Sequence, residues 1–512
     1  MSAPARLEFD DLSEEALGHL ACKLAPRLRP SDFFALKGDL GAGKSAFARF
    51  LIRAITERAD EDVPSPTFAL VQPYETGRFP IHHFDFYRLS GLSEASELGI
   101  GEALDAGLVI AEWPERLGGA LPTDRLELSL VEADRSDRRN AGLAGFGNWA
   151  ARLQRFAAID GFICGTEWRQ ARHHYLNGDA STRAYTRLRA GGASVMLMDS
   201  PKMPDGPPIR QNRPYSQIAH LAEDVKPFVA VAEALREAGL SAPRIHAQDF
   251  DAGLLILDDF GDETLTKMAG DGLDLSAPYQ LAVDALLILR KKPPRRVLPG
   301  NGVSHILPDF DREALGIETE LVVDWFLPAV RGAETPQTVR EEFAALWDEQ
   351  FDWLLRQPAG WVLRDYHSPN LLWRSGEYGL DRLGIIDFQD AMRGHLAYDL
   401  VSLLQDARID LPAGLAAALL AYYCERAAAT DAGFDVNAFL RAYRLLGAQR
   451  ATKLLGIFTR LCRRDGKRAY LQHLPRVARY LAENLNDPHL ARLKSWYERE
   501  LPGDVASLAA RL

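Results

Sequence analysis

At 512 residues the chain is too long for one hydrophobic core, and a typical domain size of about 150 residues predicts about three compact units. A hydrophobic content of 47% with 26% charged residues is typical of a globular protein and excludes a disordered or fibrous one. The net charge of -11 excludes broad electrostatic attraction to nucleic acid, although a local basic patch stays open.

The sequence carries no recognisable signal for export or membrane insertion. Its first six residues lack the apolar core of a signal peptide, and no segment holds the run of about 18 apolar residues that a membrane span needs. Four cysteines lie far apart without the paired spacing of a metal site, which favours reduced structural thiols. We therefore expect a cytoplasmic protein with no membrane contact.

The N-terminal part has the element order of an α/β unit. Ser13 precedes an amphipathic helix, and a buried strand over 33–36 leads into Gly38, after which a second helix follows at 46–51. Further strands are predicted at 67–71, 81–86 and 108–112. Residues 132–147 turn polar and contain glycine, which predicts either a turn near the end of the first domain or a linker.

The rest of the chain predicts a small β-rich lobe followed by a large helical lobe. Its first elements are a hairpin over 185–188 and 194–198, a helix around Phe228 to Leu235, and a strand over 254–257. From about residue 277 the pattern is mostly helical, interrupted by a loop region at 361–391. We place a first domain at 1–158 and a second at 159–512, with its small lobe at about 165–262 and its large lobe at about 263–512.

Gly38 to Ser45 carry the full pattern of a phosphate-binding loop, in the required place between a strand and a helix. The glycines let backbone N–H groups face phosphate oxygens, Lys44 neutralises the outer phosphates, and the Ser45 hydroxyl ligates magnesium. The sequence therefore predicts an α/β P-loop NTPase domain that uses ATP and Mg²⁺. The predicted nucleotide contacts are Asp39, Leu40, Gly41, Ala42, Gly43, Lys44 and Ser45.

Three further segments narrow the class of ATPase. They are Val63 to Val71, His83 to Leu89 and Ala111 to Glu115, and together with the P-loop they resemble the signature of the TsaE (YjeE) ATPase family over about residues 5–155. The resemblance implies a small ATPase that assists the threonylcarbamoyl-transferase complex proteins, which modify an adenosine in ANN-decoding tRNAs. It implies that tRNA is contacted at most indirectly.

The same resemblance assigns roles to two carboxylates. It implies that Glu112 joins Ser45 at magnesium and that Asp85 is catalytic, acting on the metal or the attacking water. A plain strand-end or turn role stays open for Asp85. His83 is more simply a buried or partner-facing imidazole, and Trp113 is either a stacking residue or a packed aromatic.

A second nucleotide site of unrelated design is predicted in the large lobe. Asp365 follows an apolar run, Asn370 lies five positions later, and Asp387 ends the apolar run 383–386. A kinase-like phosphotransferase needs this spacing, because one carboxylate takes the proton of the acceptor hydroxyl while the amide and the later carboxylate hold magnesium on the phosphates. Asp365 is thus the predicted base, and Asn370 and Asp387 are the predicted metal ligands.

Here the chain resembles the aminoglycoside phosphotransferase superfamily, a protein-kinase-like α+β fold, over about residues 165–512. The segments that narrow the resemblance to the AmgK family of N-acetylmuramate and N-acetylglucosamine 1-kinases are Leu176 to Arg183, Leu197 to Pro201, Leu257 to Gly261, Gly456 to Phe458 and Arg463 to Lys467. The resemblance implies transfer of the γ-phosphate of ATP to the C1 hydroxyl of an amino-sugar substrate, in peptidoglycan recycling.

It also implies where this kinase holds ATP. A loop would cover the phosphates with Gly178, Ala180, Ser181 and Thr182, and the backbone at Leu257 and Asp259 would receive adenine. Two departures from the general kinase pattern affect this site. The strand 195–198 carries no phosphate-binding lysine, so Lys202 or Arg183 would have to supply that charge, and Asp387 is followed by Phe-Gln rather than Phe-Gly.

Several polar residues keep two interpretations each. Asp399 is either a brace for the catalytic loop or an ordinary acid at a helix start. An acceptor pocket or a plain helix surface would account for Glu318, Glu320 and Trp325. Phosphate or substrate binding, or a solvated helix end, would account for Arg463, Arg464 and Lys467.

The sequence therefore predicts a bifunctional protein that joins a TsaE-like ATPase to an amino-sugar kinase. One alternative keeps the kinase fold but changes the acceptor to an aminoglycoside, choline or another small alcohol. Another makes the first domain chiefly a nucleotide-dependent binding module and the second a pseudokinase.

Overall fold

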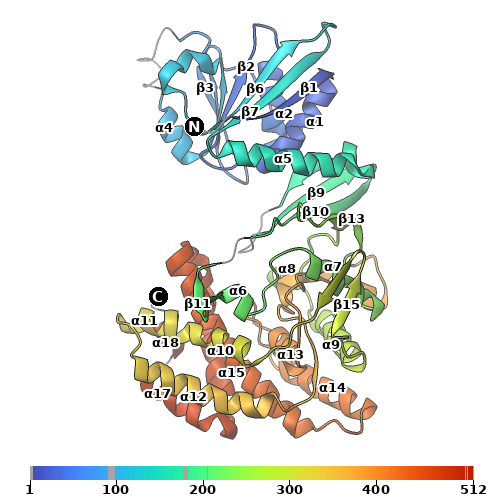
Figure 1. The fold of residues 1–512 in the computed structure, drawn as a ribbon, viewed down its shortest axis with the longest axis vertical. Helices are drawn as coiled ribbons and strands as arrows, with labels where there is room; N and C mark the ends of the chain where they lie inside the picture. The colour runs from blue at the N-terminus through green and yellow to red at the C-terminus, as the bar shows by residue number, and fades with distance from the viewer. Residues whose placement is uncertain are drawn as a thin grey trace. The chain divides into compact units, whose positions relative to one another are not determined.

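The computed structural model describes residues 4–89, 98–176, 183–203, 206–501, 503, 505–510 and 512. The chain forms two compact units: the first contains residues 1–201 and 246–259, and the second contains residues 202–245 and 260–512 (Figure 1). The predicted domain boundary at residue 158 does not coincide with a boundary between these units, because residues 159–201 belong to the first unit. It stays a prediction of where the first functional domain ends.

The first unit contains a seven-stranded sheet with the strand order β1-β7-β6-β2-β5-β4-β3. Its strands are β1 (Ala5–Leu12), β2 (Phe33–Lys37), β3 (Val71–Tyr74), β4 (Ile81–Asp85), β5 (Leu108–Glu112), β6 (Arg125–Glu132) and β7 (Arg139–Phe146). Its helices are α1 (Glu14–Leu24), α2 (Lys44–Thr56), α4 (Ile100–Ala106) and α5 (Trp149–Cys164), with short 3₁₀ segments η1 (Ala25–Arg27), η2 (Pro114–Ala120) and η3 (Glu167–Gln170).

Both faces of this sheet are buried, as the apolar runs of its central strands require. Phe34 and Leu36 of β2 face the core that also holds α1, α2 and α5, whereas Phe33 and Ala35 face the core of α4 and η2. Strands β4, β5, β2 and β6 run parallel, so β2 and β5 present their C-terminal ends at the same sheet edge. The α/β prediction for this part of the chain is confirmed.

One local prediction was wrong and another was right only in part. Residues 67–70 form a turn instead of a strand, because Leu70 has a positive φ of 64° and its N–H bonds the Pro66 carbonyl. Residues 133–138 form the predicted turn, but residues 139–146 form strand β7, which lies between β1 and β6 and sends Ala141 and Leu143 into the core.

A five-stranded sheet with the order β13-β14-β10-β9-β8 belongs to the same unit. Its strands are β8 (Arg172–Tyr175), β9 (Ala184–Ala190), β10 (Ala193–Asp199), β13 (Ile245–Asp249) and β14 (Leu254–Asp258). Asp199, at the end of β10, pairs with Arg27 of η1 at 3.2 Å and with Arg155 of α5 at 2.6 Å. These half-buried ion pairs join the small sheet to the elements of the large one.

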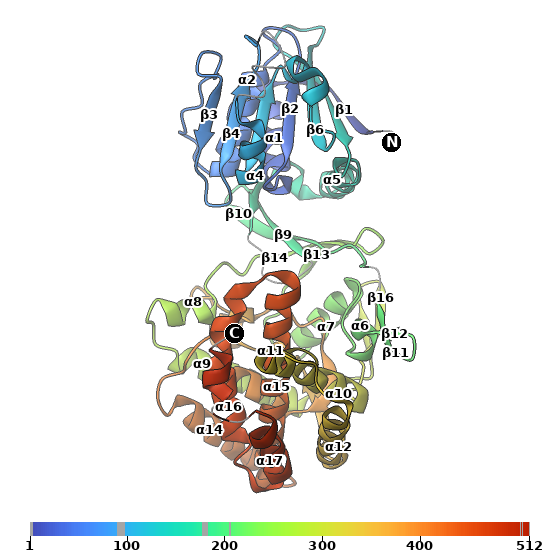
Figure 2. The same cartoon turned by 90° about the vertical axis from the view of Figure 1, so that its left-hand side faces the viewer.

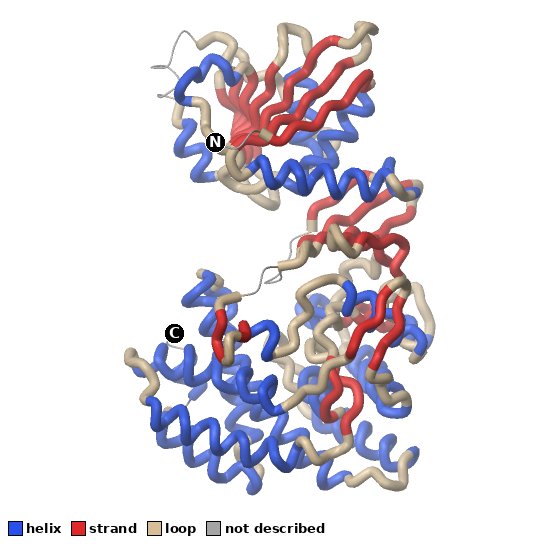
Figure 3. The backbone as a smooth tube through the Cα atoms, viewed as in Figure 1, coloured by secondary structure: helices blue, strands red, loops and turns tan. Residues whose placement is uncertain are grey.

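The second unit is mostly helical (Figure 3). Its helices are α6 (Tyr215–Ile218), α7 (Lys226–Glu237), α8 (Leu265–Gly270), α9 (Ser276–Lys291), α10 (Arg312–Leu321), α11 (Leu327–Arg331), α12 (Gln337–Leu354), α13 (Ala397–Leu404), α14 (Leu415–Thr430), α15 (Val436–Asp465), α16 (Leu474–Asn484), α17 (Ala491–Glu500) and α18 (Val505–Ala509), with a π-helical turn η4 (Val322–Phe326) after α10 and 3₁₀ segments η5 (Ser368–Asn370), η6 (Gly379–Arg382), η7 (Arg468–His473) and η8 (Pro488–Leu490).

This unit also contains four short strand pairs among its described residues. The pairs are β11 (Pro208–Arg210) with β12 (Arg213–Pro214), β15 (Val297–Gly300) with β16 (Val303–Ile306), β17 (Ala359–Val362) with β20 (Met392–His395), and β18 (Leu371–Trp373) with β19 (Leu383–Ile385). Of these, β17 with β20 and β18 with β19 flank the predicted catalytic loop. The long helix α15 packs against α10, α13 and α16 (Figure 2). Among the described helices, none is long and apolar enough to cross a membrane.

Candidate active sites

The P-loop lies where the sequence predicts it, between the end of β2 and the start of α2 at Lys44. Gly38, Gly41 and Gly43 adopt positive φ angles of 138°, 85° and 102°, a region that side chains with a Cβ disfavour. At Gly38 a Cβ would also lie 2.4 Å from the Leu130 carbonyl oxygen, so only glycine fits. The loop therefore presents its backbone and the N-terminus of α2 to a phosphate.

Lys44 is the buried cation of this loop. Its Nζ donates hydrogen bonds to the carbonyl oxygens of Gly38 at 2.7 Å and Asp39 at 2.9 Å, and lies 3.7 Å from the centroid of the Trp113 ring. Burial lowers the pKa of Lys44, while nearby carboxylates, Glu112 foremost, raise it. Trp113 is thus a packing partner of the P-loop lysine.

Glu112 ends β5 beside the P-loop and binds two side chains. The Ser45 hydroxyl donates to its Oε2 at 2.8 Å, and the His83 Nε2 lies 3.0 Å from its Oε1. His83 and Glu112 are almost fully buried, with exposures of 0% and 2%. A hydroxyl and a carboxylate are hard oxygen donors of the kind that Mg²⁺ prefers, so these residues fit a magnesium site.

Asp85 ends the neighbouring strand, opposite Glu112 in the β4–β5 register. Its Oδ2 accepts hydrogen bonds from the hydroxyls of Thr67 at 2.5 Å and Ser65 at 3.1 Å, and its Oδ1 accepts the Tyr87 N–H at 2.9 Å. The carboxylate is therefore fixed in place at the same sheet edge as the P-loop and is not a solvated turn residue.

In the second unit the catalytic loop follows β17 and carries backbone strain. Arg364 has a positive φ of 72°, which a side chain with a Cβ adopts only when the surroundings enforce it. Asp399, in the first turn of α13, supplies that restraint, because its carboxylate accepts the N–H groups of Leu363 at 2.6 Å and Arg364 at 3.0 Å. The interpretation of Asp399 as a brace for the loop is confirmed.

Asp365, Asn370 and Asp387 come together as the spacing predicts. The Asn370 Nδ2 donates to the Asp365 carbonyl oxygen at 3.0 Å and to the Asp387 Oδ2 at 3.3 Å. Gln389, which replaces the glycine of the general kinase pattern, donates its Nε2 to the Asp387 Oδ1 at 3.0 Å. The facing amide and carboxylate offer the oxygen ligands that suit Mg²⁺, with the remaining positions left for phosphate and water.

Two buried cations on α15 stand behind this loop. Arg450 donates to the Arg364 carbonyl oxygen at 3.2 Å. Lys453 donates to the Glu318 Oε1 at 2.7 Å, and the Arg364 guanidinium pairs with the same carboxylate. Burial raises the pKa of Asp365, but the nearby charges of His367, Lys453 and Arg450 together lower it by more, so that the pKa falls to about 2. The carboxylate therefore stays ionised and ready to accept a proton.

Two family models match the chain. Residues 12–141 match threonylcarbamoyl adenosine biosynthesis protein TsaE, and residues 174–440, more than half of the chain, match the phosphotransferase enzyme family. A tRNA threonylcarbamoyladenosine biosynthesis protein TsaE of Rickettsia felis is 40% identical over 126 residues, which cover 25% of this chain and 73% of the relative. The chain belongs to the phosphotransferase enzyme family and, in its N-terminal part, to the TsaE family.

Two relatives of the phosphotransferase part share the same name. An N-acetylmuramate/N-acetylglucosamine kinase of Caulobacter vibrioides is 37% identical over 358 residues, which cover 68% of this chain and 97% of the relative. A kinase of the same name from Pseudomonas aeruginosa is 36% identical over 326 residues, covering 62% of this chain and 85% of the relative. The expected family memberships and the kinase-like fold are confirmed.

Some predicted residues of the phosphotransferase lie outside the described residues. Gly178, Ala180, Ser181 and Thr182 of the phosphate-covering loop are among them. Leu257 is buried on β14, and the Asp259 carboxylate pairs with Arg187 at 2.6 Å. The roles of all these residues in nucleotide binding stay predictions.

The phosphotransferase network contains residues that sequence reasoning missed or misplaced. Glu318 is neither a helix surface residue nor an open acceptor group, because it is fully buried between Arg364, Lys453 and Gln449. Arg450 and Lys453 lie beyond the matched residues 174–440. Their one sequence signal is a pair of cations at i and i+3 inside an otherwise apolar stretch of helix.

Other polar candidates lie apart from this network. Glu320 pairs with Arg210 at 2.7 Å, Trp325 is half-buried on η4, and Arg464 pairs with its neighbour Asp465. Arg463 is exposed and donates to a backbone carbonyl oxygen. The solvated interpretation of this helix end is therefore the one that the contacts favour.

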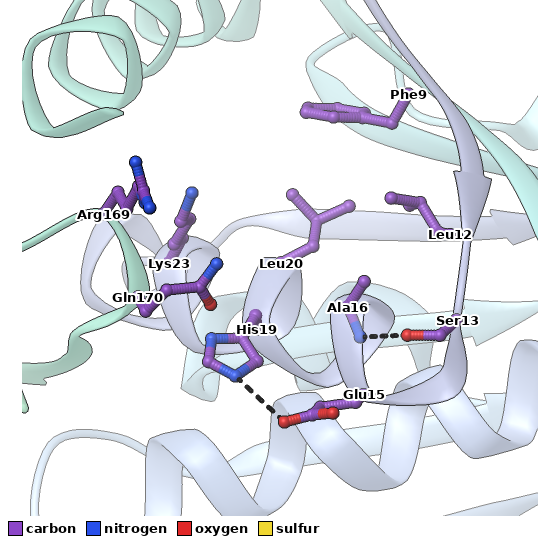
Figure 4. A pocket seen from close by; sticks show the side chains of 10 residues that line it. All are labelled: Phe9, Leu12, Ser13, Glu15, Ala16, His19, Leu20, Lys23, Arg169 and Gln170. Atoms are coloured by element: carbon purple, nitrogen blue, oxygen red, sulfur yellow. Dashed lines mark hydrogen bonds and ion pairs between the residues drawn. The ribbon is translucent and has the colours of Figure 1, made fainter. Parts of the chain in front are cut away.

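The first unit also contains a recess that no motif predicts. It has a volume of about 360 Å³ and is lined by residues of β1, α1 and η3, with Phe9, Leu12 and Leu20 on one side and His19, Lys23, Arg169 and Gln170 on the other (Figure 4). None of the P-loop residues lines it, so it is separate from the ATPase site of the TsaE part.

Proposed function

We propose that this protein carries two independent ATP-dependent activities. Residues 1–158 form an ATPase that supports threonylcarbamoyladenosine formation in tRNA, and residues 159–512 form a kinase that phosphorylates the C1 hydroxyl of N-acetylmuramate and N-acetylglucosamine. The observation that carries the kinase proposal is the meeting of Asp365, Asn370 and Asp387 in one loop cluster. Both activities consume ATP, which supports a cytoplasmic location.

In the kinase, Asp365 accepts the proton of the acceptor hydroxyl as that oxygen attacks the γ-phosphorus, and the bond from this phosphorus to the bridging β-phosphate oxygen breaks and releases ADP. Its low pKa of about 2 keeps it ionised, while Asp399 and Arg450 hold the backbone on either side of the strained Arg364. Asn370 and Asp387 would hold magnesium, which neutralises charge on the phosphates when bound. Gln389 orients the Asp387 carboxylate for that role.

In the ATPase, the P-loop backbone and Lys44 would bind the phosphates, and Ser45 with Glu112 would hold magnesium. His83 fixes the Glu112 carboxylate from its far side. Asp85 would orient the attacking water, and its hydrogen bonds from Thr67 and the Tyr87 N–H, which fix the carboxylate, support this role. Since β4 and β5 are adjacent parallel strands, these carboxylates share one edge of the sheet.

The charges around the catalytic loop favour an amino sugar over the alternative acceptors. Aminoglycosides and choline are cations, and a cationic acceptor needs carboxylates that are free to receive it. Buried cations, namely Arg364, Arg450 and Lys453, surround Asp365 instead, and Glu318 is already paired with two of them. A neutral or acidic acceptor suits this environment better.

The kinase activity is tested by incubating the purified full-length protein with N-acetylmuramate, ATP and Mg²⁺ and identifying the product by phosphorus NMR. We expect the sugar 1-phosphate from the wild type and none from Asp365→Asn, while ATP hydrolysis at the P-loop survives in the variant. An active, folded wild type that forms no sugar phosphate would refute the assignment.

The N-terminal activity is tested through its partners. We expect the threonylcarbamoyl-transferase complex proteins to be retained by the wild type in the presence of ATP and Mg²⁺, and retention to fall in Lys44→Ala. Retention that is equal with and without nucleotide would contradict a nucleotide-dependent role. Binding without any hydrolysis would favour the binding-module alternative.

A further inference from the structure

One face of helix α15 carries three cations in line with the catalytic loop. Arg450, Lys453 and Arg460 follow one another at i, i+3 and i+10, a spacing that keeps them on the same side of a helix. Arg450 and Lys453 belong to the network behind Asp365, whereas Arg460 lies about two turns, or roughly 10 Å, beyond Lys453. These three residues, Arg450, Lys453 and Arg460, form a cationic stripe that extends along the helix from the network behind Asp365.

Tyr215 connects the two parts of this stripe. The Arg460 guanidinium lies 5.0 Å from the centroid of the Tyr215 ring. Burial raises the pKa of the Tyr215 hydroxyl, and the charges that act on it further include Glu318 and Lys453. Tyr215 thus contacts Arg460 and also lies within electrostatic range of the network that holds the catalytic loop.

Arg460 lacks a partner for its charge. In the part of the chain that the structure describes, its guanidinium makes no hydrogen bond or ion pair, and its Nε is buried without an acceptor. Burial lowers its pKa. By contrast, Lys453 pairs with Glu318 and Arg464 with Asp465 on the same helix. A partly desolvated guanidinium without an anion is costly, which indicates that a ligand supplies one.

We propose that Arg460, stacked on Tyr215, binds a carboxylate of the acceptor and so makes the kinase prefer acidic amino sugars over neutral ones. The inference rests on the proposed kinase function. A guanidinium suits a carboxylate because its paired N–H groups match the two oxygens. With its reacting hydroxyl at Asp365, an acidic amino sugar would direct its carboxylate along α15, on the helix face that carries Arg450, Lys453 and Arg460.

The test compares an acidic and a neutral acceptor in the full-length protein. Steady-state kinetics with N-acetylmuramate and with N-acetylglucosamine are measured for the wild type and for Arg460→Gln. We expect kcat/KM for N-acetylmuramate to fall about 10- to 100-fold, as for loss of a charged hydrogen-bonded pair, while the value for N-acetylglucosamine changes less than about two-fold. Arg460→Lys keeps the charge and is expected to recover part of the loss.

Arg441 provides the matched control. It lies on the same helix, with its guanidinium 3.9 Å from the Trp353 ring centroid and its Nε likewise buried and unpaired. No contact links it to the Asp365 network among the described residues. Arg441→Gln should leave the ratio of the two kcat/KM values unchanged.

A second measurement does not depend on any variant folding. The methyl ester of N-acetylmuramate removes the negative charge, and we expect the wild type to phosphorylate it about 10- to 100-fold less efficiently than the free acid. Equal use of acid and ester, or equal loss of both acceptors in a folded Arg460→Gln protein, would overturn the inference.

Two further outcomes distinguish an error in the carboxylate assignment from an error in the proposed kinase function. If Arg460→Gln raises the KM for ATP with both acceptors, the anion that Arg460 binds is a nucleotide phosphate and the carboxylate assignment is wrong. If the wild type phosphorylates neither sugar, the proposed function itself fails and this inference falls with it.

Discussion

The P-loop site and the catalytic-loop site differ in the elements that supply their residues. The first is built from one continuous loop and the ends of two neighbouring strands, and the buried cation of its loop, Lys44, lies near the carboxylates of Glu112 and Asp85. The second draws on side chains of α10, α13 and α15, which bring the buried Glu318, Asp399, Arg450 and Lys453 to the segment that carries Asp365.

The two sites also differ in the hydrogen bonds that hold their residues in place. Some hydrogen bonds of the P-loop are local in sequence, as between Lys44 and the Gly38 carbonyl oxygen, and others reach a strand end, as between Ser45 and Glu112. The catalytic loop depends on three elements of the helical unit, because Arg364 bonds Asp399, Glu318 and Arg450, which lie 35, 46 and 86 residues away in sequence. Its geometry is therefore a property of the whole helical unit. The following changes should affect one site and leave the other intact.

The largest expected effect is on the kinase metal site. Asp387→Asn removes one charged oxygen ligand, and we expect kcat/KM for sugar phosphorylation to fall on the order of 10³-fold. ATP hydrolysis measured without sugar should stay within about two-fold of the wild type, because Ser45 and Glu112 are untouched. A parallel fall in both activities would contradict two separate metal sites.

The next largest effect is on stability. Glu318→Gln leaves Arg364 and Lys453 buried without a charged partner, and we expect the free energy of unfolding to fall on the order of 3–5 kcal/mol. Denaturant unfolding measures this change, and Glu320→Gln is the control. Glu320 pairs with Arg210 in a partly exposed position, so its loss should cost at most about 1 kcal/mol. Equal effects of the two variants would show that the buried network is not stabilising.

Asp399 should make stability depend on pH. Burial raises its pKa to about 7, above the ordinary value of about 4, so the folded protein retains a proton that the unfolded chain releases. Its contribution to stability is therefore full below about pH 4 and is lost as the pH rises to about 7, by at most about 4 kcal/mol. The difference in unfolding free energy between wild type and Asp399→Asn should decrease over that window. A difference that is flat with pH would refute the raised pKa.

The smallest expected effect concerns the metal affinity of the ATPase. His83 orients Glu112, and its loss in His83→Ala should raise the Mg²⁺ concentration for half-maximal ATP hydrolysis about 10- to 100-fold, as for other residues that hold a metal ligand. The Mg²⁺ requirement of sugar phosphorylation should not change. An unaltered requirement for hydrolysis would reduce His83 to a packing residue.

The same contrast explains what could be predicted from the sequence. The P-loop and the Asp365 to Asp387 constellation are encoded by local spacing, and Glu112 was assigned by the family resemblance, so the sequence predicted that each group comes together, while the roles of these residues stay predictions. The strand predicted at 67–71 failed because Leu70 turns the chain with a positive φ and bonds the Pro66 carbonyl oxygen, while Thr67 bonds Asp85. Arg450, Lys453 and the burial of Glu318 were missed because their pairing spans 86 to 135 residues, and the i, i+3 spacing of the two cations does not identify the partners.

The claim that the two ATP sites work separately is tested most directly by the rate at which Lys44→Ala forms sugar 1-phosphate. Two separate sites predict a rate within about two-fold of the wild type, although ATP hydrolysis without sugar is abolished in the same preparation. A folded Lys44→Ala protein that no longer phosphorylates the sugar would contradict the claim, since the P-loop would then serve the kinase.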